Sequence, residues 1–239
     1  MSIWLRLGEF ANRISTTVRA GAATIVSAVR GAFGGDPELR KKVAFSVAMI
    51  ALSAKMAKAD GVVTQDEIRA FHEIFSAPPS ELRNVARLYD LAQADTAGFE
   101  AYAAQVVKLC GTGHKNCAFL EDILDGLFHI AKADGLLHER ENRFLHRIAE
   151  IFEINEDHYR SILARHIDIG EADPYVVLGV TRGSSFEEVR KTYRRLVANN
   201  HPDRLIGRGM PEEFIAIATR RLAAINAAFE AVEREFQPA

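Results

Sequence analysis

The residues with the clearest chemical pattern are His201, Pro202 and Asp203, which follow one another directly. A histidine can bind a metal or act as a base, but this one has no second ligand or nucleophile placed near it. Four basic residues precede the triplet in two rows of i,i+4 spacing: Arg190, Lys191, Arg194 and Arg195. Such a charged helix face is either a solvated surface or a local patch for recognising another molecule.

A second pattern consists of four acidic residues at equal spacing. Asp60 matches Asp134 and Glu67 matches Glu141, with an offset of 74 residues in both cases (134 − 60 and 141 − 67). If the two copies pack about a pseudo-twofold axis, the four carboxylates could converge on a divalent cation such as Ca²⁺ or Mg²⁺. The alternative is turn and cap chemistry, with Asp before Gly at a helix end and Glu in a first helical turn. This alternative explains all four residues without a metal.

The two cysteines, Cys110 and Cys117, lie close to His114. A zinc site would need a fourth ligand, and the spacing between the cysteines is wider than that of zinc knuckles. Two cysteines are also too few for a disulfide scaffold. We therefore expect an inter-helix loop in which the cysteines are small apolar side chains. Residues 37–168 contain no nucleophile–base pair and no phosphate loop, so we expect no enzymatic activity and no required cofactor.

The composition is that of a soluble globular protein, with 48% hydrophobic and 26% charged residues and a net charge of −2. The small net charge gives no general attraction to nucleic acid, and none is expected as a partner. No window of about 18 residues is free of charge, so no transmembrane helix is predicted. The first residues also lack the apolar core of a signal peptide. We expect a cytoplasmic location.

Residues 1–35 carry four arginines against one glutamate and end in Gly34-Gly35, which Asp36-Pro37 follows. Within residues 1–33 an approximate apolar stripe is formed by Trp4, Leu5, Phe10, Ile14 and Val18. This pattern is compatible with a basic amphipathic helix at the inner membrane surface. The same residues could instead form a flexible or docked N-terminal arm, and we favour this second interpretation.

The elements that position these residues are predicted to be helical throughout, which gives an all-α fold. Residues 37–168 have helical spacing and contain a repeat, in which AKADGVVTQDEIRAFHEIF (57–75) recurs as AKADGLLHERENRFLHRIA (131–149). In each copy a helix closes at Asp-Gly, and a new helix then opens, at Thr64 in the first copy and at His138 in the second. A linker over 169–172 leads to a compact unit at 173–236.

The last unit has its own start and stop signals. Asp173-Pro174 opens a first helix, and Ser184 or Ser185 caps the next one with Glu187 or Glu188. That helix ends at Asn200 or His201, because Pro202 follows. A Gly-rich loop then leads to a final helix from about Pro211. The sequence predicts an antiparallel helical hairpin with His201-Pro202-Asp203 at its exposed tip.

This unit resembles the J-domain of the DnaJ/Hsp40 co-chaperones. The resemblance rests on DPYVVLGV, EEVRKTYRRLVANNHPDR and INAAF, and covers roughly 65 residues. It implies that the chain stimulates the ATPase of an Hsp70 of the DnaK type. His201, Pro202 and Asp203 would then dock on the Hsp70 ATPase domain together with Arg190, Lys191, Arg194 and Arg195. Asp203 would accept a charge-assisted hydrogen bond from an arginine of that partner.

The repeated KADG-x5-E unit, from Lys58 to Glu67 and from Lys132 to Glu141, is similar to the helical domain of the tellurite-resistance protein TerB. DnaJ-like proteins with a TerB-like domain ahead of a C-terminal J-domain form a subfamily, some of whose members have an N-terminal membrane helix. Here Arg19 and Arg30 interrupt any such span. The resemblance implies an adaptor that selects a client protein or a location, or alternatively a metal- or stress-sensing module with the J-domain as its output. Homo-oligomerisation through the arm or the helical domain is open.

Overall fold

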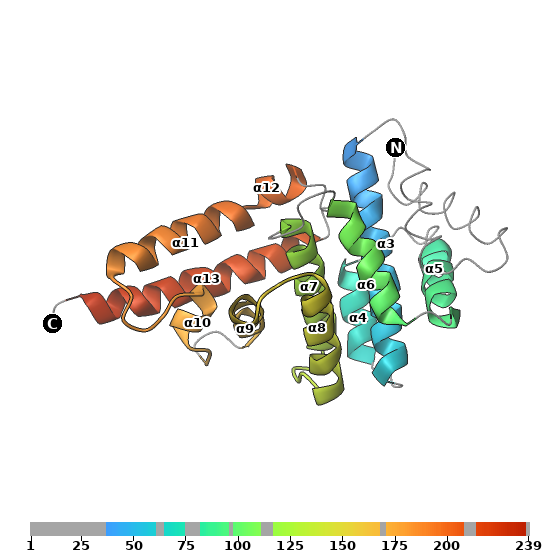
Figure 1. The fold of residues 1–239 in the computed structure, drawn as a ribbon, viewed down its shortest axis with the longest axis horizontal. Helices are drawn as coiled ribbons and strands as arrows, with labels where there is room; N and C mark the ends of the chain where they lie inside the picture. Colours follow the sequence, from blue (N-terminus) through green and yellow to red (C-terminus); the bar gives the residue numbers. More distant parts are fainter. Residues whose placement is uncertain are drawn as a thin grey trace. The chain divides into compact units, whose positions relative to one another are not determined.

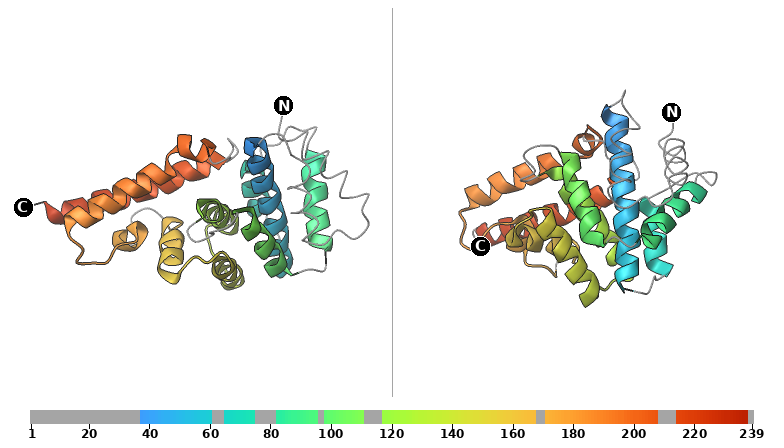
Figure 2. Two further views of the ribbon diagram at one scale, coloured as in Figure 1. Left: turned by 45° about the horizontal axis from the view of Figure 1, so that its top comes forward. Right: turned by 45° about the vertical axis from the view of Figure 1, so that its right-hand side comes forward.

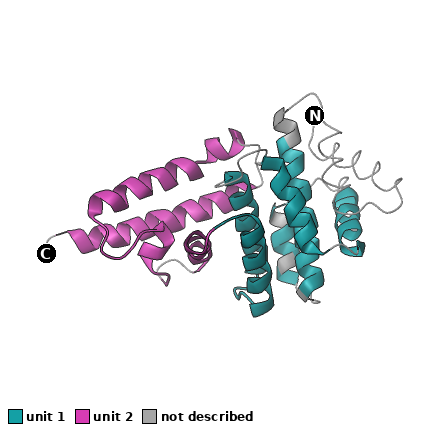
Figure 3. Cartoon of the chain, viewed as in Figure 1, with its two compact units in different colours: residues 1–154, 208–213 teal, residues 155–207, 214–239 magenta. Residues whose placement is uncertain are grey.

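The computed structural model describes residues 37–60, 65–74, 82–95, 98–110, 117–167, 171–207 and 214–237. Every regular element in these ranges is a helix (Figure 1), which confirms the all-α prediction. The chain divides into two compact units, residues 1–154 with 208–213 and residues 155–207 with 214–239 (Figure 3). None of the helices within the described ranges is long and apolar enough to cross a membrane. The arm expected at 1–35 lies outside these ranges.

The first unit is built around α3 (Pro37–Asp60). All residues from Val43 to Ala57 are buried, because this helix is apolar on every side and its many alanines let neighbouring helices approach closely. The helices that pack on it are α5 (Leu82–Ala94), α6 (Phe99–Val107), α7 (Ala118–Ala131) and α8 (Glu139–Ile151). Helix α4 (Gln65–Ile74) packs on α7. Figure 2 shows two further views of this bundle.

The buried Lys55 on α3 makes a hydrogen bond that links α3 to the C-terminal end of α5. The Nζ of Lys55 donates a hydrogen bond to the carbonyl of Asp95 at 2.8 Å, and it lies 4.8 Å from the centre of the Tyr102 ring. The Tyr102 hydroxyl donates to Asp95 Oδ2 at 2.7 Å. Lys58, one turn further along α3, donates to the carbonyl of Gln93 at 2.8 Å. The two ammonium groups therefore satisfy carbonyls at the C-terminal end of α5, while burial lowers the pKa of Lys55.

The two copies of the sequence repeat fall on two pairs of consecutive helices. The end of α3 and α4 form the first copy, and α7 and α8 form the second. In the second copy Gly135 adopts the left-handed region with φ of +89°, as expected for the Asp-Gly helix ending. His138 is the N-cap of α8, and its backbone N–H donates to Glu141 Oε2 at 2.9 Å. In the second copy α7 and α8 pack on one another as a hairpin, whereas the duplication of this hairpin stays a prediction.

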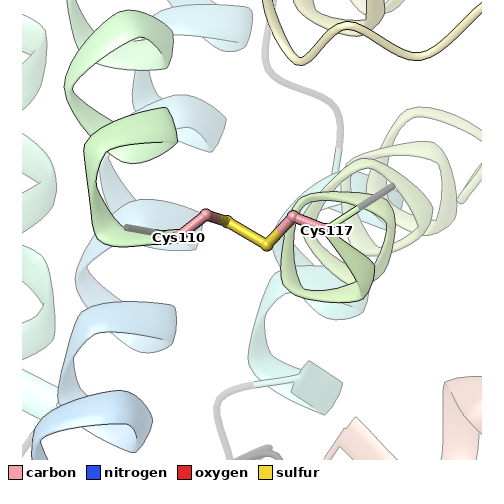
Figure 4. The surroundings of a disulfide bond; sticks show 2 residues. All are labelled: Cys110 and Cys117. Atoms are coloured by element: carbon pink, nitrogen blue, oxygen red, sulfur yellow. A yellow bond between two sulfur atoms is a disulfide. The ribbon is translucent and has the colours of Figure 1, made fainter. Parts of the chain in front are cut away.

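The expectation that Cys110 and Cys117 are apolar side chains of a loop is wrong. They form a disulfide, with Cα atoms 6.4 Å apart (Figure 4). Cys110 ends a short 3-10 helix, η1 (Lys108–Cys110), and Cys117 is the N-cap of α7. Residues seven apart in sequence are brought together because both flanking helices pack on α3, which fixes the two ends of the connection. The cross-link joins α6 and η1 to the start of α7.

The described part of the second unit contains five helices: α9 (Glu156–Arg165), α10 (Pro174–Leu178), α11 (Phe186–Asn200), α12 (Pro202–Gly207) and α13 (Ile215–Phe236). Helices α11 and α13 run side by side, and α10 packs against both (Figures 1 and 2). Asp173 caps α10 by accepting from the Tyr175 N–H at 3.0 Å, as its position before Pro174 predicts. The core of the unit consists of Ala164, Tyr175, Val177, Leu178, Val189, Ile225, Ala228 and Val232.

Two boundaries in this unit differ from the expectation. The stretch after Pro202 was expected to be a loop, but its first part is the helix α12, which the buried Leu205 anchors. The final helix was expected from about Pro211 and begins at Ile215. The reason for the first difference is that Pro202 not only ends α11 but also suits the first position of the next helix, where its missing N–H has no cost.

Helix α9, which the sequence assigned to the 37–168 domain, packs on α10 in the second unit. The buried hydroxyl of Ser161 donates to the carbonyl of Val177 at 3.0 Å, and Arg165 Nη2 donates to the Ser161 Oγ at 3.1 Å. Arg165 Nε also reaches the Val177 carbonyl, at 3.5 Å. Because α10 has only five residues, these donors from α9 supply a large part of the support for its C-terminal carbonyls.

Removing the Ser161 hydroxyl is expected to loosen this contact. Ser161→Ala takes away one donor to Val177 and the acceptor for Arg165, which should cost about 1–3 kcal/mol of stability for a buried group. Hydrogen exchange of the α10 amides should accelerate accordingly. Ser184→Ala removes a half-buried hydroxyl that shares a hydrogen bond with the Thr181 hydroxyl; it is the control and should change stability by less than about 0.5 kcal/mol. Equal exchange rates in the two variants would contradict the role given to Ser161.

Candidate functional site

Helix α11 begins at a capping box. Ser185 is its N-cap, with the Glu188 N–H donating to Ser185 Oγ at 3.3 Å and the Ser185 N–H donating to Glu188 Oε2 at 2.9 Å. The sequence left open which serine and which glutamate take part, and the structure selects this pair. Hydrogen bonds from the Ser185 backbone and hydroxyl lower the pKa of Glu188, because they stabilise its charged form.

One face of α11 is fixed against α13. Val189 is completely buried, and the Tyr193 ring stacks on Phe229 with ring centres 4.0 Å apart. The Tyr193 hydroxyl donates to Asn226 Oδ1 at 3.1 Å. With this face fixed, the predicted basic residues lie on the other side of the helix and are exposed: Arg190, Lys191, Arg194 and Arg195. The structure thus presents all four as one surface, which we call the basic face.

The His201-Pro202-Asp203 triplet forms the junction between α11 and α12. Helix α11 ends at Asn200, and His201 has extended backbone angles (φ −64°, ψ 134°). The His201 carbonyl then accepts hydrogen bonds from Arg204 N at 3.0 Å and Leu205 N at 3.2 Å, which starts α12. The triplet is therefore held by ordered backbone on both sides.

The side chains of the triplet point outward. His201 is 54% exposed and Asp203 is 88% exposed. The Asp203 N–H donates to His201 Nδ1 at 3.3 Å. The same nitrogen lies 3.6 Å from Asp203 Oδ2. The junction thus presents an exposed carboxylate and an exposed imidazole to another molecule.

Two residues that sequence reasoning missed hold the junction. Arg204 Nη1 donates to Asn199 Oδ1 at 2.8 Å, which ties α12 to the last turn of α11. The buried Asn200 donates from Nδ2 to the Leu196 carbonyl at 2.8 Å. The signal in the sequence is the pair of asparagines directly before His201, since asparagine side chains bond readily to nearby backbone at helix ends.

The acidic residues considered as metal ligands are only partly within the described structure. Asp134 Oδ1 accepts from the Leu136 N–H at 2.9 Å, and Glu141 is engaged at the N-terminus of α8. The side chains of Asp60 and Glu67 lie outside the described residues. Within the part of the chain that is described, no three potential ligands gather at one point. The contacts of Asp134 and Glu141 are those of turn and cap chemistry, and the cation site stays a prediction.

Metal titration tests this site directly. We expect the melting temperature to stay constant in millimolar Ca²⁺, Mg²⁺ or Zn²⁺, because the carboxylates of Asp134 and Glu141 already have local hydrogen-bond partners. A ligand at 100 times its Kd would stabilise the fold by about 2.7 kcal/mol, which a thermal melt resolves easily. If the temperature rises, repeating the titration with Asp134→Asn shows whether the repeat carboxylates are responsible.

Two family models match the chain. The first, described as "Tellurite resistance protein TerB", matches residues 46–164. The second, described as "DnaJ domain", matches residues 173–235 and so includes α10 to α13. The chain thus has a TerB domain followed by a C-terminal DnaJ domain. The triplet and the basic face both belong to the DnaJ domain, or J-domain. Helix α9 falls within the TerB match, although it packs on the J-domain.

The chain is also similar to proteins named "Co-chaperone protein DjlA". The one from Photobacterium profundum is 28% identical over 240 residues, which covers 86% of this chain and 84% of that protein. The one from Coxiella burnetii is 27% identical and covers 75% of this chain and 73% of that protein. The one from Photorhabdus laumondii is 30% identical over 141 residues, about half of each chain. No solved structure matches.

Proposed function

We propose that the chain is a co-chaperone whose J-domain binds an Hsp70 of the DnaK type and stimulates its ATP hydrolysis. The observation that carries the proposal is the junction of α11 and α12, where exposed His201 and Asp203 flank Pro202 beside the basic face. The relatives named as co-chaperones, which the chain matches over both domains, support the same function. The hydrolysis belongs to the Hsp70, so the chain itself needs no catalytic residue.

The geometry suits a brief and directed contact. The exposed Asp203 carboxylate, which lies 3.6 Å from His201 Nδ1, would accept a charge-assisted hydrogen bond from an arginine of the Hsp70, and such bonds are about twice as strong as neutral ones. The basic face on α11 would meet an acidic surface of the same partner. Exposed charges at the rim of an interface mainly raise the association rate. The triplet would then act as the trigger, and the basic face would guide the encounter.

The TerB domain is proposed to act as the adaptor that selects a client protein or a location. The partner of the J-domain would place the chain in the cytoplasm, where an ATP-dependent Hsp70 works. Contact with the inner membrane surface through residues 1–33, homo-oligomerisation and binding of a divalent cation are predictions of the sequence alone. A metal- or stress-sensing role for the TerB domain would require the cation site that the titration tests.

Charge reversal on the basic face tests the proposal. Arg190→Glu with Arg194→Glu should raise the concentration needed for half-maximal stimulation of DnaK ATPase by about tenfold at low salt. The effect should shrink at high ionic strength, because exposed charges are screened. Arg220→Glu, an equally exposed change on α13, is the control and should leave stimulation unchanged. If wild-type protein does not stimulate the ATPase at all, the proposed function is wrong.

A further inference from the structure

The first unit carries an apolar groove that none of the features above uses. It lies between α3, α4 and α5 and has a volume of about 250 Å³. Its walls include Met56 from α3, Ile68 and Phe71 from α4, and Leu82 and Tyr89 from α5. The rings of Phe71 and Tyr89 meet edge to face, with centres 5.6 Å apart. Ile68 and Leu82 are both 37% exposed, so the groove opens to the surface.

The size and the chemistry of the groove indicate what could fill it. Sites for drug-sized ligands and cofactors usually measure about 300–1,000 Å³ and include precisely placed polar groups. This groove is smaller, and no charged side chain lines it among the described residues. A few apolar side chains of a polypeptide would fit better than a cofactor would. Helix-in-groove contacts use residues at i, i+3, i+4 and i+7, and the apolar stripe of a helix continues at i+8.

We propose that the groove is the docking site of the chain's own N-terminal segment, residues 1–33. This segment lies outside the described residues. It supplies apolar side chains at the required spacing, since Phe10, Ile14 and Val18 follow each other at i, i+4 and i+8. Buried isoleucine, phenylalanine and valine side chains stabilise a contact by removing apolar surface from water. The docking is independent of the Hsp70 interaction proposed for the J-domain.

The connection to α3 gives the segment the right reach and register. The groove residues Ser53, Met56 and Ala57 come 16 to 20 residues after Pro37, which is roughly 24–30 Å along α3 at 1.5 Å per residue. Gly34-Gly35 directly precedes the helix and suits a turn between two antiparallel helices. In such a helical hairpin, the residues 16 to 20 positions before this turn lie opposite the groove. These positions fall on Ile14 and Val18.

The charges of the two partners are complementary. Residues 1–33 contain four arginines and one glutamate, a formal charge of +3. The sequence of α4 contains Asp66, Glu67 and Glu73 against Arg69, a formal charge of −2. The sequence of α5 contains Arg83 and Arg87 against Asp90, a formal charge of +1, so the two helices together carry −1. Opposite charges around an apolar contact favour association and help to select the partner. The segment therefore matches the groove in its apolar spacing, its reach and its charge.

The test uses the full chain with a photo-cross-linking amino acid at position 14 or, as the matched control, at position 16. Thr16 lies about 160° from Ile14 around a helix of 3.6 residues per turn and so faces away from the groove. We expect position 14 to cross-link to peptides of α4 and α5 and position 16 to do so about tenfold less. A mixture of isotope-labelled and unlabelled chains shows whether the cross-link joins residues of one chain. Equal yields from both positions, no cross-link to α4 or α5, or cross-links only between two copies would overturn the proposal.

A variant of the groove provides the second arm. Ala86 lines the groove and is exposed, so Ala86→Arg should leave the fold intact while placing a cation against the basic segment. The cross-link from position 14 should fall by about tenfold, the expected scale for losing one good apolar contact. Ala223→Arg, the same change at an exposed alanine of α13, should have no effect. If the yield is unchanged in Ala86→Arg, with circular dichroism showing intact helices, the segment does not occupy this groove.

Discussion

His201→Gln is expected to abolish stimulation of DnaK ATP hydrolysis while leaving the fold intact. The side chain is 54% exposed, and among the described residues it contacts Asp203 of its own junction, so the fold loses little. The lost contact lies at the centre of the proposed interface, where removing one group typically costs about 2–4 kcal/mol, or roughly 30-fold or more in affinity. A steady-state ATPase assay with the full chain and DnaK measures the effect, and thermal unfolding verifies that the variant is folded.

The matched control is His146→Gln, which makes the same chemical change on the exposed surface of α8. This variant should stimulate the ATPase as well as the wild type does. Asp203→Asn provides an independent check, because it keeps the size of the side chain and removes the charge that an arginine of the partner would bind. Full stimulation by His201→Gln would show that the junction is not the site of action.

Removing the disulfide is expected to give the largest change in the stability of the first unit. Cys110→Ser with Cys117→Ser opens a loop of eight residues, counted from a sequence separation of seven. The loop-entropy relation gives about 2.5 kcal/mol for a loop of this length. A loss of this size is a large fraction of the stability of an ordinary domain. Urea unfolding of the oxidised protein and the variant, followed by circular dichroism, measures the difference.

Reduction of the wild-type protein provides the control for the serine substitutions. If the cross-link is the cause, reduced wild type and the double variant should unfold at the same urea concentration, below that of the oxidised protein. The double variant should not respond to the reductant. Identical midpoints for oxidised and reduced wild type would show that the bond contributes no stability to the folded unit.

The parts of the site that the sequence predicts are those fixed by local rules. Pro202 ends α11 at Asn200, because proline restricts the residue before it and cannot continue the hydrogen-bond pattern. Ser185 and Glu188 form the capping box that their spacing suggests. The apolar spacing of Val189 and Tyr193 places the basic residues on the opposite side of the helix. Each of these features depends on residues no more than about four positions apart.

The features that the sequence did not predict depend on contacts between elements. The disulfide forms because packing on α3 brings η1 and α7 together, and no local pattern encodes that distance. Helix α9 has an ordinary amphipathic sequence that could pack in either unit. Its packing on α10 depends on contacts between the two helices, such as the hydrogen bonds from Ser161 and Arg165 to the Val177 carbonyl. Helix α12 was missed because a proline signals both the end of one helix and the start of the next.

The place of α9 bears on how this J-domain could have moved between proteins. The DnaJ match begins at residue 173, whereas the packed unit begins at residue 155. A gene fusion that inherited only residues 173–236 would leave the Val177 carbonyl without Ser161 and Arg165. A fusion that inherited residues 155–237 would keep α9 with both of these hydrogen-bond donors. The structural unit that supports the J-domain is therefore longer than the DnaJ match, and it includes α9.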